Sequence, residues 1–464
     1  MHVSIVGTGY VGLVTGLCLA EQGHRVACVD VDTAKIARLA DGVLPLYEPG
    51  LDELLDRHLG TRFFPTTDLE KAVKESELTM ITVGTPIEGG AISLKFIESA
   101  ADAIGRALGH KPDYHVVVVK STVVPGTTED CVGPALERAS GKKVGVDIGL
   151  GMNPEFLREG EAVEDFQNPD RIVLGAVDAR SHEWMVRLYA PFHDAQKILT
   201  NTRTAEMIKY ASNALLATLI SFSNEIGNLC SAAPDVDVVD VLGAVHLDKR
   251  ISPLTPDRGR ITPSITAYLR AGCGFGGSCF PKDVRALIRW GQDHQRPVRL
   301  LTSVLETNEA QHGEVVALLK KHFPSLAGIR VSVLGLAFKA GTDDIRESPA
   351  LRVIPALARE GAQVIACDPV AIPAVRLALD EKNIQYAQSL TEAIEGVDAI
   401  VLLTAWPEFL QLPDLLEDLT EAPVVIDGRR AFEKARLRRY EGIGLRSTAV
   451  TKPGFDREGV EAEI

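Results

Sequence analysis

A short apolar run followed at once by a glycine-rich turn opens the chain. Residues 3–6 are a candidate buried strand, and Gly7-Thr8-Gly9-Tyr10-Val11-Gly12 leads from it into an apolar helical pattern. The glycines permit a tight turn, close approach of a pyrophosphate and close helix packing, while the helix N-terminus attracts phosphate charge. Strand, turn and helix in this order predict a dinucleotide-binding α/β unit.

The acid that ends the second candidate strand indicates which dinucleotide binds. This strand covers residues 25–29 and is followed by Asp30. A carboxylate at this place can bind the ribose hydroxyls and would repel a 2′-phosphate. We therefore predict NAD as the cofactor rather than NADP.

Strands and helices continue to alternate, which predicts a parallel sheet with helices on both faces. Candidate strands at residues 78–83 and 115–119 are followed by Gly84-Thr85-Pro86 and Lys120-Ser121-Thr122. Ligands of such sheets bind beyond the carboxyl ends of the strands. Thr85 and Thr122 are therefore predicted to contact the cofactor.

The run Gly274-Phe275-Gly276-Gly277-Ser278-Cys279-Phe280-Pro281-Lys282-Asp283 carries the candidate nucleophile. Pro281 suits the first turn of a helix, so Cys279 should lie just outside a helix N-terminus. The partial positive charge there favours a thiolate. The alternative interpretation is a structural cysteine in a glycine-rich turn.

A long helix and a second α/β unit complete the expected organisation. Apolar residues recur at helical spacing over residues 204–231, where Lys209 and Asn213 share one face. Candidate strands at residues 330–334, 363–367, 398–403 and 424–426 form the second unit. Its first turn lacks the G-x-G-x-x-G spacing and carries Lys339 and Arg346, cations that suit a diphosphate.

Composition excludes several classes of protein. The chain has 464 residues, enough for two or three domains, and a net charge of −14 without a long basic run, which argues against nucleic-acid or membrane-surface binding. Met1 leads directly into the first strand, and no stretch of about 18 apolar residues suggests a membrane span. Seven cysteines without disulfide-like spacing fit a reducing compartment, so we predict a cytoplasmic protein. No spacing of His and Cys suggests a metal site.

Taken in order, these motifs resemble the UDP-glucose/GDP-mannose dehydrogenase family. The resemblance also rests on Tyr47-Glu48-Pro49-Gly50-Leu51, on Asn-Pro-Glu-Phe-Leu-Arg-Glu-Gly at residues 153–160 and on Leu336-Ala337-Phe338-Lys339. It implies an α/β fold with two doubly wound Rossmann-like domains joined by a central helical domain. The expected limits are 1–198 for the NAD domain, 199–315 for a central dimerisation domain with the long connecting helix, and 316–450 for the nucleotide-sugar domain. Residues 451–464 are a polar tail.

The resemblance also implies the chemistry. Oxidation of a primary alcohol to an acid removes four electrons, so the aldehyde must be held between two hydride transfers to NAD. Cys279 would capture it as a thiohemiacetal, which is oxidised to a thioester and then hydrolysed. Lys209 and Asn213 would stabilise the oxyanions, and Asp283 would orient Lys209 or a water. Glu155 would exchange protons, through Thr122 and a water.

Binding residues follow from the same resemblance. The cofactor is expected to contact Gly7, Gly9, Val11, Gly12, Asp30, Lys35, Thr85, Thr122, Glu159 and Arg346, with Lys35 reaching the adenosine ribose. The nucleotide sugar is expected to contact Glu155, Phe156, Leu157, Arg158, Lys209, Asn213, Tyr268, Leu269, Gly276, Phe338, Lys339 and Arg429. An insertion before Tyr268 leaves Arg250 and Arg260 as alternatives for the arginine that reaches the sugar of a partner subunit.

The form of residues 153–160 favours glucose or mannose nucleotides over N-acetylated sugars. We expect UDP-glucose, with GDP-mannose or another nucleotide sugar as the alternative. A one-step hydride dehydrogenase in which Cys279 is only structural is an alternative of another class. A non-catalytic sensor of nucleotide sugars fits poorly, because Cys279, Lys209 and Asp283 are all present.

Overall fold

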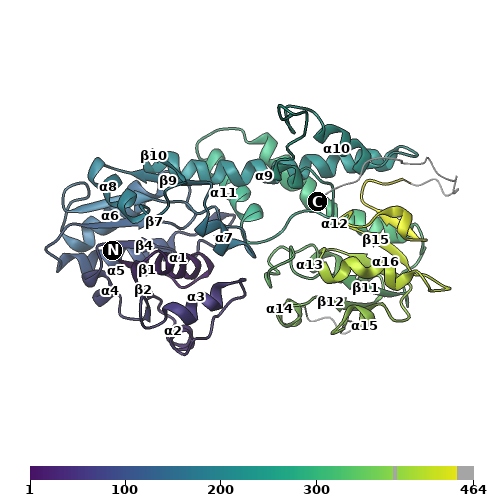
Figure 1. Cartoon of the computed structure of the whole chain (residues 1–464), viewed down its shortest axis with the longest axis horizontal. Coiled ribbons are helices and arrows are strands. Elements are labelled where there is room, and N and C mark those ends of the chain that lie inside the picture. The colour runs from purple at the N-terminus through teal and green to yellow at the C-terminus, as the bar shows by residue number, and fades with distance from the viewer. Residues whose placement is uncertain (380–383, 447–464) are drawn as a thin grey trace.

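Two open β-sheets, joined by one long helix, form the body of the molecule (Figure 1). The structure is a computed structural model that describes residues 1–379 and 384–446. The predicted polar tail 451–464 and residues 447–450 of the predicted C-terminal domain lie outside the described residues. The predicted fold class, with two Rossmann-like units and a helical central region, is confirmed.

The N-terminal unit is an eight-stranded sheet in the order β10-β9-β8-β7-β4-β1-β2-β3. Its strands are β1 (His2–Val6), β2 (Arg25–Val29), β3 (Phe63–Thr66), β4 (Leu78–Ile81), β7 (His115–Val119), β8 (Ile148–Met152), β9 (Arg171–Ala176) and β10 (Gln196–Thr200). The expectation of a purely parallel sheet needs a correction, because β9 pairs with β8 antiparallel. The chain turns back after β8 through α7, and this turn carries the segment 153–160 toward the centre of the molecule.

Helices cover both faces of this sheet. They are α1 (Tyr10–Glu21), α2 (Thr33–Ala40), α3 (Leu51–His58), α4 (Leu69–Glu75), α5 (Lys95–Gly109), a π-helical turn η1 (Thr128–Val132), α6 (Gly133–Ser140), α7 (Ala162–Gln167) and α8 (Ala179–Leu188), with a small hairpin of β5 (Ile87–Glu88) and β6 (Ala91–Ile92). In β7, Val116 and Val118 pack on the side of α1 and α8, whereas Val117 and Val119 pack on the side of α5 and α6. Alternate side chains of a strand point to opposite faces, so a strand buried on both faces is apolar throughout.

The central region is helical. It consists of α9 (Thr202–Ala232), α10 (Val238–His246), a 3₁₀ turn η2 (Ser264–Tyr268), α11 (Phe280–Asp293) and α12 (Arg299–Lys320). Asn201 caps α9 by accepting a hydrogen bond from the Thr204 N–H at 2.8 Å. Helices α9, α11 and α12 share a small apolar core around Ala217, Phe275 and Val284. This core fixes the start of α11 against the middle of α9.

The C-terminal unit is a six-stranded parallel sheet in the order β13-β12-β11-β14-β15-β16. Its elements are β11 (Arg330–Leu334), α13 (Ala350–Arg359), β12 (Gln363–Cys367), α14 (Ile372–Ala378), β13 (Ile384–Tyr386), α15 (Leu390–Ile394), β14 (Ala399–Leu402), η3 (Pro407–Gln411), α16 (Leu412–Leu416), β15 (Val424–Asp427), η4 (Lys434–Arg436) and β16 (Tyr440–Gly442). An irregular segment, residues 335–349, separates β11 from α13. It faces the N-terminal unit.

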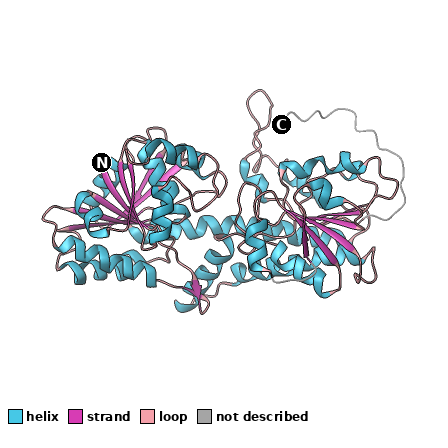
Figure 2. Ribbon diagram, turned by 90° about the horizontal axis from the view of Figure 1, so that it is seen from below, coloured by secondary structure: helices cyan, strands magenta, loops and turns pink. Residues whose placement is uncertain are grey.

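The two sheets lie on either side of the central helices (Figure 2). The units meet where Gly160, after β8, lies against Gly341, after β11, since a Cβ on Gly160 would be 2.6 Å from the Gly341 carbonyl oxygen. Within residues 1–379 and 384–446, no helix is both long and apolar enough to cross a membrane. The seven cysteines are all free.

Candidate active site

The turn between β1 and α1 fits a pyrophosphate. Helix α1 begins at Tyr10, so the N–H groups of its first turn, which includes Val11, have no acceptor within the helix. A Cβ on Gly12 would lie 1.9 Å from the Gly7 carbonyl oxygen, so only glycine lets helix and turn approach this closely. A Cβ on Gly9 would meet nothing within 4 Å, which leaves room for a ligand beside the backbone.

Asp30, just beyond β2, has one carboxylate oxygen that is largely committed to the protein. Oδ2 accepts hydrogen bonds from the Thr8 N–H (2.8 Å) and hydroxyl (2.6 Å) and from Lys35 Nζ (3.0 Å). Oδ1 accepts one from the Asp32 N–H at 3.0 Å. Burial opposes the charge, but the hydrogen bonds from Thr8, Asp32 and Lys35 lower the pKa of Asp30 to about 2. An ionised acid beside Lys35 therefore lies where a ribose would bind, and the residues present fit NAD.

Thr85 and Thr122 come together at the same edge of the sheet. They follow β4 and β7, which are neighbouring parallel strands. The Thr85 hydroxyl donates to the Thr122 carbonyl oxygen at 3.1 Å. Both predicted cofactor contacts thus lie beyond the carboxyl ends of the strands.

A buried ion pair joins the segment after β8 to α9. Lys209 Nζ lies 2.8 Å from Glu155 Oε1, and the two side chains are 4% and 6% exposed. The Leu157 N–H donates to Glu155 Oε2 at 2.7 Å, and the Phe156 ring centroid lies 5.6 Å from Lys209 Nζ. Burial opposes both charges, but their attraction leaves the pKa of Glu155 lowered and that of Lys209 raised. The carboxylate can accept a proton, and the ammonium can donate to an oxyanion.

Asn213 lies one turn after Lys209 on α9 and contacts the start of α11. Its Nδ2 donates to Asp283 Oδ2 at 2.7 Å. Asp283 is 1% exposed and also pairs with its neighbour Lys282. The sequence predicts that Asp283 orients Lys209 or a water. In the structure its hydrogen bonds go to Asn213 and Lys282, because Lys209 is paired with Glu155.

Cys279 is the residue before α11, with Pro281 in the first turn of the helix as predicted. The Ser278 hydroxyl lies 3.5 Å from its Sγ. The expected thiolate needs a correction. Loss of water around the thiol, together with the charges of Glu155 and Asp283, raises the pKa of Cys279 to about 11 despite the nearby Lys209. A helix N-terminus contributes only about 0.3–1 kcal/mol, too little to offset these effects.

Glu159 lies between the two sheets and has an oxygen free for a ligand. Its Oε1 accepts from the Ser278 hydroxyl at 3.0 Å and lies 3.6 Å from a nitrogen of Arg346. Its Oε2 is buried and has no hydrogen-bond partner among the described residues. Burial and the nearby Asp344 raise the pKa of Glu159 to about 7, and Asp344 also holds Arg346 at 2.8 Å.

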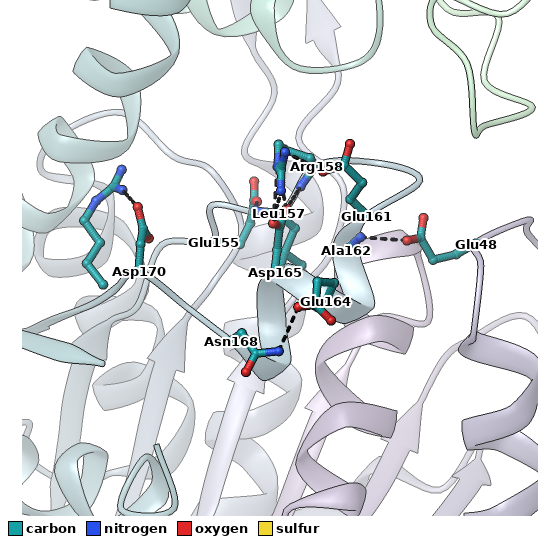
Figure 3. Close-up of polar contacts among 11 residues, drawn as sticks. Glu48, Glu155, Leu157, Arg158, Glu161, Ala162, Glu164, Asp165, Asn168 and Asp170 are labelled. Atoms are coloured by element: carbon teal, nitrogen blue, oxygen red, sulfur yellow. Dashed lines mark hydrogen bonds and ion pairs between the residues drawn. The ribbon is translucent and has the colours of Figure 1, made fainter. Parts of the chain in front are cut away.

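Arg158 lies in the segment that leads into α7, next to Asp165 and Glu161 (Figure 3). Its guanidinium pairs with Asp165 at 2.6 Å and with Glu161, and the side chain is half exposed. Phe156 also stacks against Arg171, with 4.1 Å between the guanidinium carbon and the ring centroid. The family resemblance assigned Arg158 to the nucleotide sugar. In the structure its side chain is half exposed and does not lie among the buried groups.

Glu48 holds this segment in place, a role that sequence reasoning missed. Its carboxylate accepts hydrogen bonds from the Gly160 N–H (2.6 Å), the Ala162 N–H (2.7 Å) and the Tyr10 hydroxyl (Figure 3 shows the bond from Ala162). Burial and Glu48 raise the pKa of Tyr10, which keeps that hydroxyl protonated. Glu48 lies in a motif that contributed to the family resemblance. The sequence around this loop acid does not indicate that its partners are the N–H groups of Gly160 and Ala162.

Arg429 ties the C-terminal sheet to the cysteine segment. Its guanidinium donates to the carbonyl oxygens of Gly274 (3.1 Å) and Phe338 (3.2 Å). A Cβ on Gly276 would lie 3.2 Å from Phe338 Cβ. Lys339 follows Phe338 in the chain, and burial lowers its pKa. The structure thus gathers the predicted contacts Gly276, Phe338, Lys339 and Arg429 at one junction.

Tyr268 and Leu269 follow the central insertion and approach the same junction. The Tyr268 ring centroid lies 6.3 Å from that of Phe280, directly after Cys279. The Leu269 carbonyl oxygen accepts from His246 Nε2 at 2.9 Å. Helix α10 therefore anchors this pair.

The two arginine candidates lie outside the buried cluster. Arg250 pairs with Asp248, and its side chain is 85% exposed. Arg260 donates to the carbonyl oxygens of Leu247 (2.6 Å) and Ser252 (2.8 Å), so it holds its own loop together. Arg250 has the more accessible guanidinium. In the part of the chain that the structure describes, no group of acidic, His and Cys side chains is arranged to hold a metal ion.

Comparison with known families covers the chain in three successive parts. The NAD binding domain of the UDP-glucose/GDP-mannose dehydrogenase family matches residues 1–193, its central domain matches 203–310 and its UDP binding domain matches 332–434. The UDP-glucose 6-dehydrogenase of Haloferax volcanii is 43% identical over 96% of this chain and 100% of its own length. That of Bacillus subtilis, TuaD, is 41% identical over 97% of this chain and 95% of its own length.

Solved structures give the same grouping. A UDP-glucose dehydrogenase from Pyrobaculum islandicum superposes with a TM-score of 0.86 at 40% identity, covering 96% of this chain and 98% of that one. A GDP-mannose dehydrogenase from Pseudomonas aeruginosa, 35% identical, covers 96% of this chain and 100% of its own but reaches a TM-score of only 0.53.

Proposed function

The chain belongs to the UDP-glucose/GDP-mannose dehydrogenase family, and we propose that it oxidises C6 of UDP-glucose to the carboxylate of UDP-glucuronate. It is an NAD-dependent oxidoreductase. The choice of UDP-glucose over GDP-mannose is supported by the full-length relatives and by the closer superposition on the UDP-glucose enzyme.

One observation carries the proposal: Glu155, Lys209, Asn213 and Asp283 converge in a buried cluster whose charges act on the thiol of Cys279. These groups come from the segment after β8, from α9 and from α11, so the fold alone brings them together. A base, an ammonium, an amide and a nucleophile in one dry site are what alcohol and aldehyde oxidation require.

The first oxidation needs a base at the sugar hydroxyl. Bound NAD accepts a hydride in each of the two oxidations. The ionised Glu155 carboxylate takes the C6 hydroxyl proton, directly or through a water held at Thr122. Lys209, with its raised pKa, stays protonated and stabilises the alkoxide together with Asn213.

The second oxidation runs through a covalent bond to Cys279. Sulfur adds to the aldehyde carbon, and because the thiol is protonated, its proton moves to the aldehyde oxygen as the C–S bond forms. Glu155 first passes the proton of the first oxidation to solvent, and it does so again before hydrolysis. The thiohemiacetal hydroxyl then gives its proton to the ionised Glu155 as the second hydride leaves, and a thioester results. Water activated by Glu155 adds to the thioester, the C–S bond breaks, and the carboxylate and the thiol are released.

Binding follows the two sheets. NAD would be held by the Gly7–Gly12 turn, Asp30, Lys35, Thr85 and Thr122, with Glu159 and Arg346 closing over it. The nucleotide sugar would lie against Leu157, Arg158, Tyr268, Leu269, Gly276, Phe338, Lys339 and Arg429. The division into domains at 1–198, 199–315 and 316–450 is part of this proposal, and the cytoplasmic location stays a prediction.

The assembly is proposed to be a homodimer or a larger homo-oligomer. Leu215, Phe222 and Leu229 recur every seven residues along α9 and are 53%, 48% and 64% exposed. Closed twofold pairing is the commonest way to bury such a stripe. Sedimentation under assay conditions tests this, and either Arg250 or Arg260 would then reach the partner's sugar.

The decisive experiment follows NADH with a panel of UDP-, TDP- and GDP-sugars. UDP-glucose should be the best substrate and should yield two NADH per sugar. Cys279→Ser should abolish acid formation, because a serine hydroxyl is a far weaker nucleophile at neutral pH. One NADH per sugar in the wild type would identify a one-step dehydrogenase, and normal turnover by Cys279→Ser would rule out the covalent route.

A further inference from the structure

Lys120 is a buried lysine that the mechanism above leaves without a role. It follows β7 and lies beside the segment that carries Glu155, since β7 and β8 pair in parallel and the Asn153 N–H donates to the Val119 carbonyl oxygen at 2.9 Å. The residue is 4% exposed. A lysine is almost never this deeply buried without a partner charge.

The side chain of Lys120 ends in neutral surroundings. Its Nζ donates to Asn153 Oδ1 at 2.9 Å and lies 5.8 Å from the centroid of the Phe166 ring. The same Asn153 oxygen accepts from the Tyr189 hydroxyl at 2.5 Å, while Asn153 Nδ2 donates to the Val173 carbonyl oxygen at 2.9 Å. Within residues 1–379 and 384–446, Lys120 forms no ion pair. The amide therefore fixes the position of the ammonium but does not neutralise it.

The charged group that attracts Lys120 is Glu155. Burial lowers the pKa of Lys120 to about 8, with the charge of Glu155 opposing that fall and the charge of Lys209 adding to it. Conversely, Lys120 is one of the groups that hold the pKa of Glu155 down. Glu155 thus has two ammonium groups near it. Lys209 is in direct contact with its carboxylate, and Lys120 is hydrogen-bonded to Asn153, two residues earlier in the same segment.

The other ionisable groups around this pair belong to the reaction centre or are neutral. Cys279 and Asp283 act on Lys209 from α11. Tyr189, at the end of α8, donates to the same Asn153 oxygen as Lys120 and stays protonated because burial raises its pKa. Among the described residues, Lys120 and Lys209 are the ammonium groups that act on Glu155. Of these two, Lys120 is the one held by a hydrogen bond to Asn153 and so kept from the sugar and the thiol.

We propose that Lys120 is a positioning residue that acts through Glu155: its fixed ammonium keeps the Glu155 carboxylate ionised while Lys209 is engaged with the oxygen on C6. This inference rests on the proposed function, in which Lys209 must turn toward the alkoxide and the thiohemiacetal oxygen. At that moment Glu155 loses its contact partner, and a buried carboxylate without a nearby cation would take up a proton. Glu155 could then no longer act as a base.

The test is the pH dependence of kcat/KM for the nucleotide sugar in Lys120→Met and Lys120→Gln. Activity that needs ionised Glu155 is lost as the pH falls through the pKa of Glu155. Removal of the Lys120 charge should raise that pKa and so move the acid limb of the profile to higher pH. We expect a shift of about one pH unit and about a tenfold loss of kcat/KM below the limb. KM for NAD should change less than about twofold, since the Lys120 ammonium is hydrogen-bonded to Asn153 and is not one of the groups proposed to bind NAD.

Two matched variants separate charge from structure. Tyr189→Phe removes the other donor to the Asn153 oxygen without changing a charge, so it should lower the melting temperature but leave the acid limb in place. Lys120→Arg keeps the charge and should keep the limb near its wild-type position.

An unmoved acid limb in a folded Lys120→Met or Lys120→Gln would overturn the proposal. Failure of both uncharged variants to fold would also overturn it, because the charge would then serve the fold. The proposed substrate is judged separately. If the wild type prefers another nucleotide sugar, UDP-glucose is wrong, and the profiles are measured with the preferred sugar.

Discussion

The two Rossmann-like units place an aspartate at the same point and use it in opposite ways. Asp30 follows β2, and Asp368 follows β12, in each case the second strand of the unit. In both units the first strand is followed by a glycine at positive φ, Gly7 at 111° and Gly335 at 91°. The N–H of each glycine donates to the last residue of the second strand of its unit. The scaffolds are therefore equivalent up to this point.

The surroundings of the two acids then diverge. Asp368 is 4% exposed, and protein groups donate to both of its oxygens. The donors are the N–H groups of Leu336, Ala337, Val370 and Ala371 and the indole N–H of Trp406. Asp30 has one oxygen with a single partner, the Asp32 N–H. The ribose position is thus open in the first unit and filled by the protein in the second.

The turn after the first strand of the C-terminal unit and the acid after its second strand are therefore not arranged as in the N-terminal unit. The first turn of the C-terminal unit extends over residues 335–349 instead of entering a helix at once. The acid that would bind ribose instead holds that long turn in shape. This long turn places Phe338 and Lys339 next to the cysteine segment. Arg429 donates a hydrogen bond to the Phe338 carbonyl oxygen there.

The largest effect should come from Asp368→Ala. The substitution leaves five buried N–H donors without their acceptor, and each such loss costs about 1–3 kcal/mol. Because water can enter the vacated space and satisfy some of them, we expect a net loss of at least about 4 kcal/mol in unfolding free energy. Urea unfolding of the full chain measures it. Asp30→Ala should cost about 1 kcal/mol by the same assay, because its neighbours can turn to water. Equal losses in the two variants would remove the distinction between the units.

The next effect concerns cofactor choice. With Asp30 in place, NAD should be preferred over NADP by about 100-fold or more, corresponding to a charge conflict of about 3 kcal/mol with the 2′-phosphate. Asp30→Ala should bring the two values of kcat/KM close to each other. Asp68→Ala, which removes an acid that caps α4 in the same unit, is the control and should keep the preference. NADP use equal to NAD use in the wild type would contradict the assignment of Asp30.

The smallest effect should appear in acid. The pKa of Asp30 is lowered to about 2, below its ordinary 3.8, so its contribution to stability is present above about pH 4 and is lost as the pH falls toward 2. The difference in unfolding free energy between wild type and Asp30→Asn, about 1 kcal/mol at pH 5 after screening by solvent, should shrink at pH 3. Urea titrations at the two pH values measure this. A difference that grows on acidification would show that the sign is wrong.

Features that depend on interactions between residues close in the sequence could be predicted, whereas features that depend on residues distant in the sequence could not. The first turn was predictable because Gly7–Gly12 and Asp30 act through local geometry. Asp368 was not, since an acid after an apolar strand looks the same whether it awaits a ribose or accepts five protein N–H groups. The reversal of β9 was missed for a related reason, because alternating strands and helices do not encode direction.

The buried cluster shows the same limit. Family resemblance named Glu155, Lys209 and Cys279, but their charge states depend on groups that only the fold brings together. A helix N-terminus next to Cys279 predicted a thiolate. Burial of the thiol, together with the carboxylates of Glu155 and Asp283, raises the pKa of Cys279 and reverses that expectation.

The protonated thiol has a consequence for the lifetime of the protein. The pKa of Cys279, raised to about 11 by burial, keeps its thiol protonated at neutral pH. Peroxides and alkylating agents react with the thiolate, so the resting chain is shielded from irreversible oxidation although Cys279 is partly exposed. In the proposed reaction, the sulfur would react only when a carbonyl carbon is in place to accept it as its proton departs. The burial that overturned the predicted thiolate therefore also protects the Cys279 sulfur from unwanted reactions.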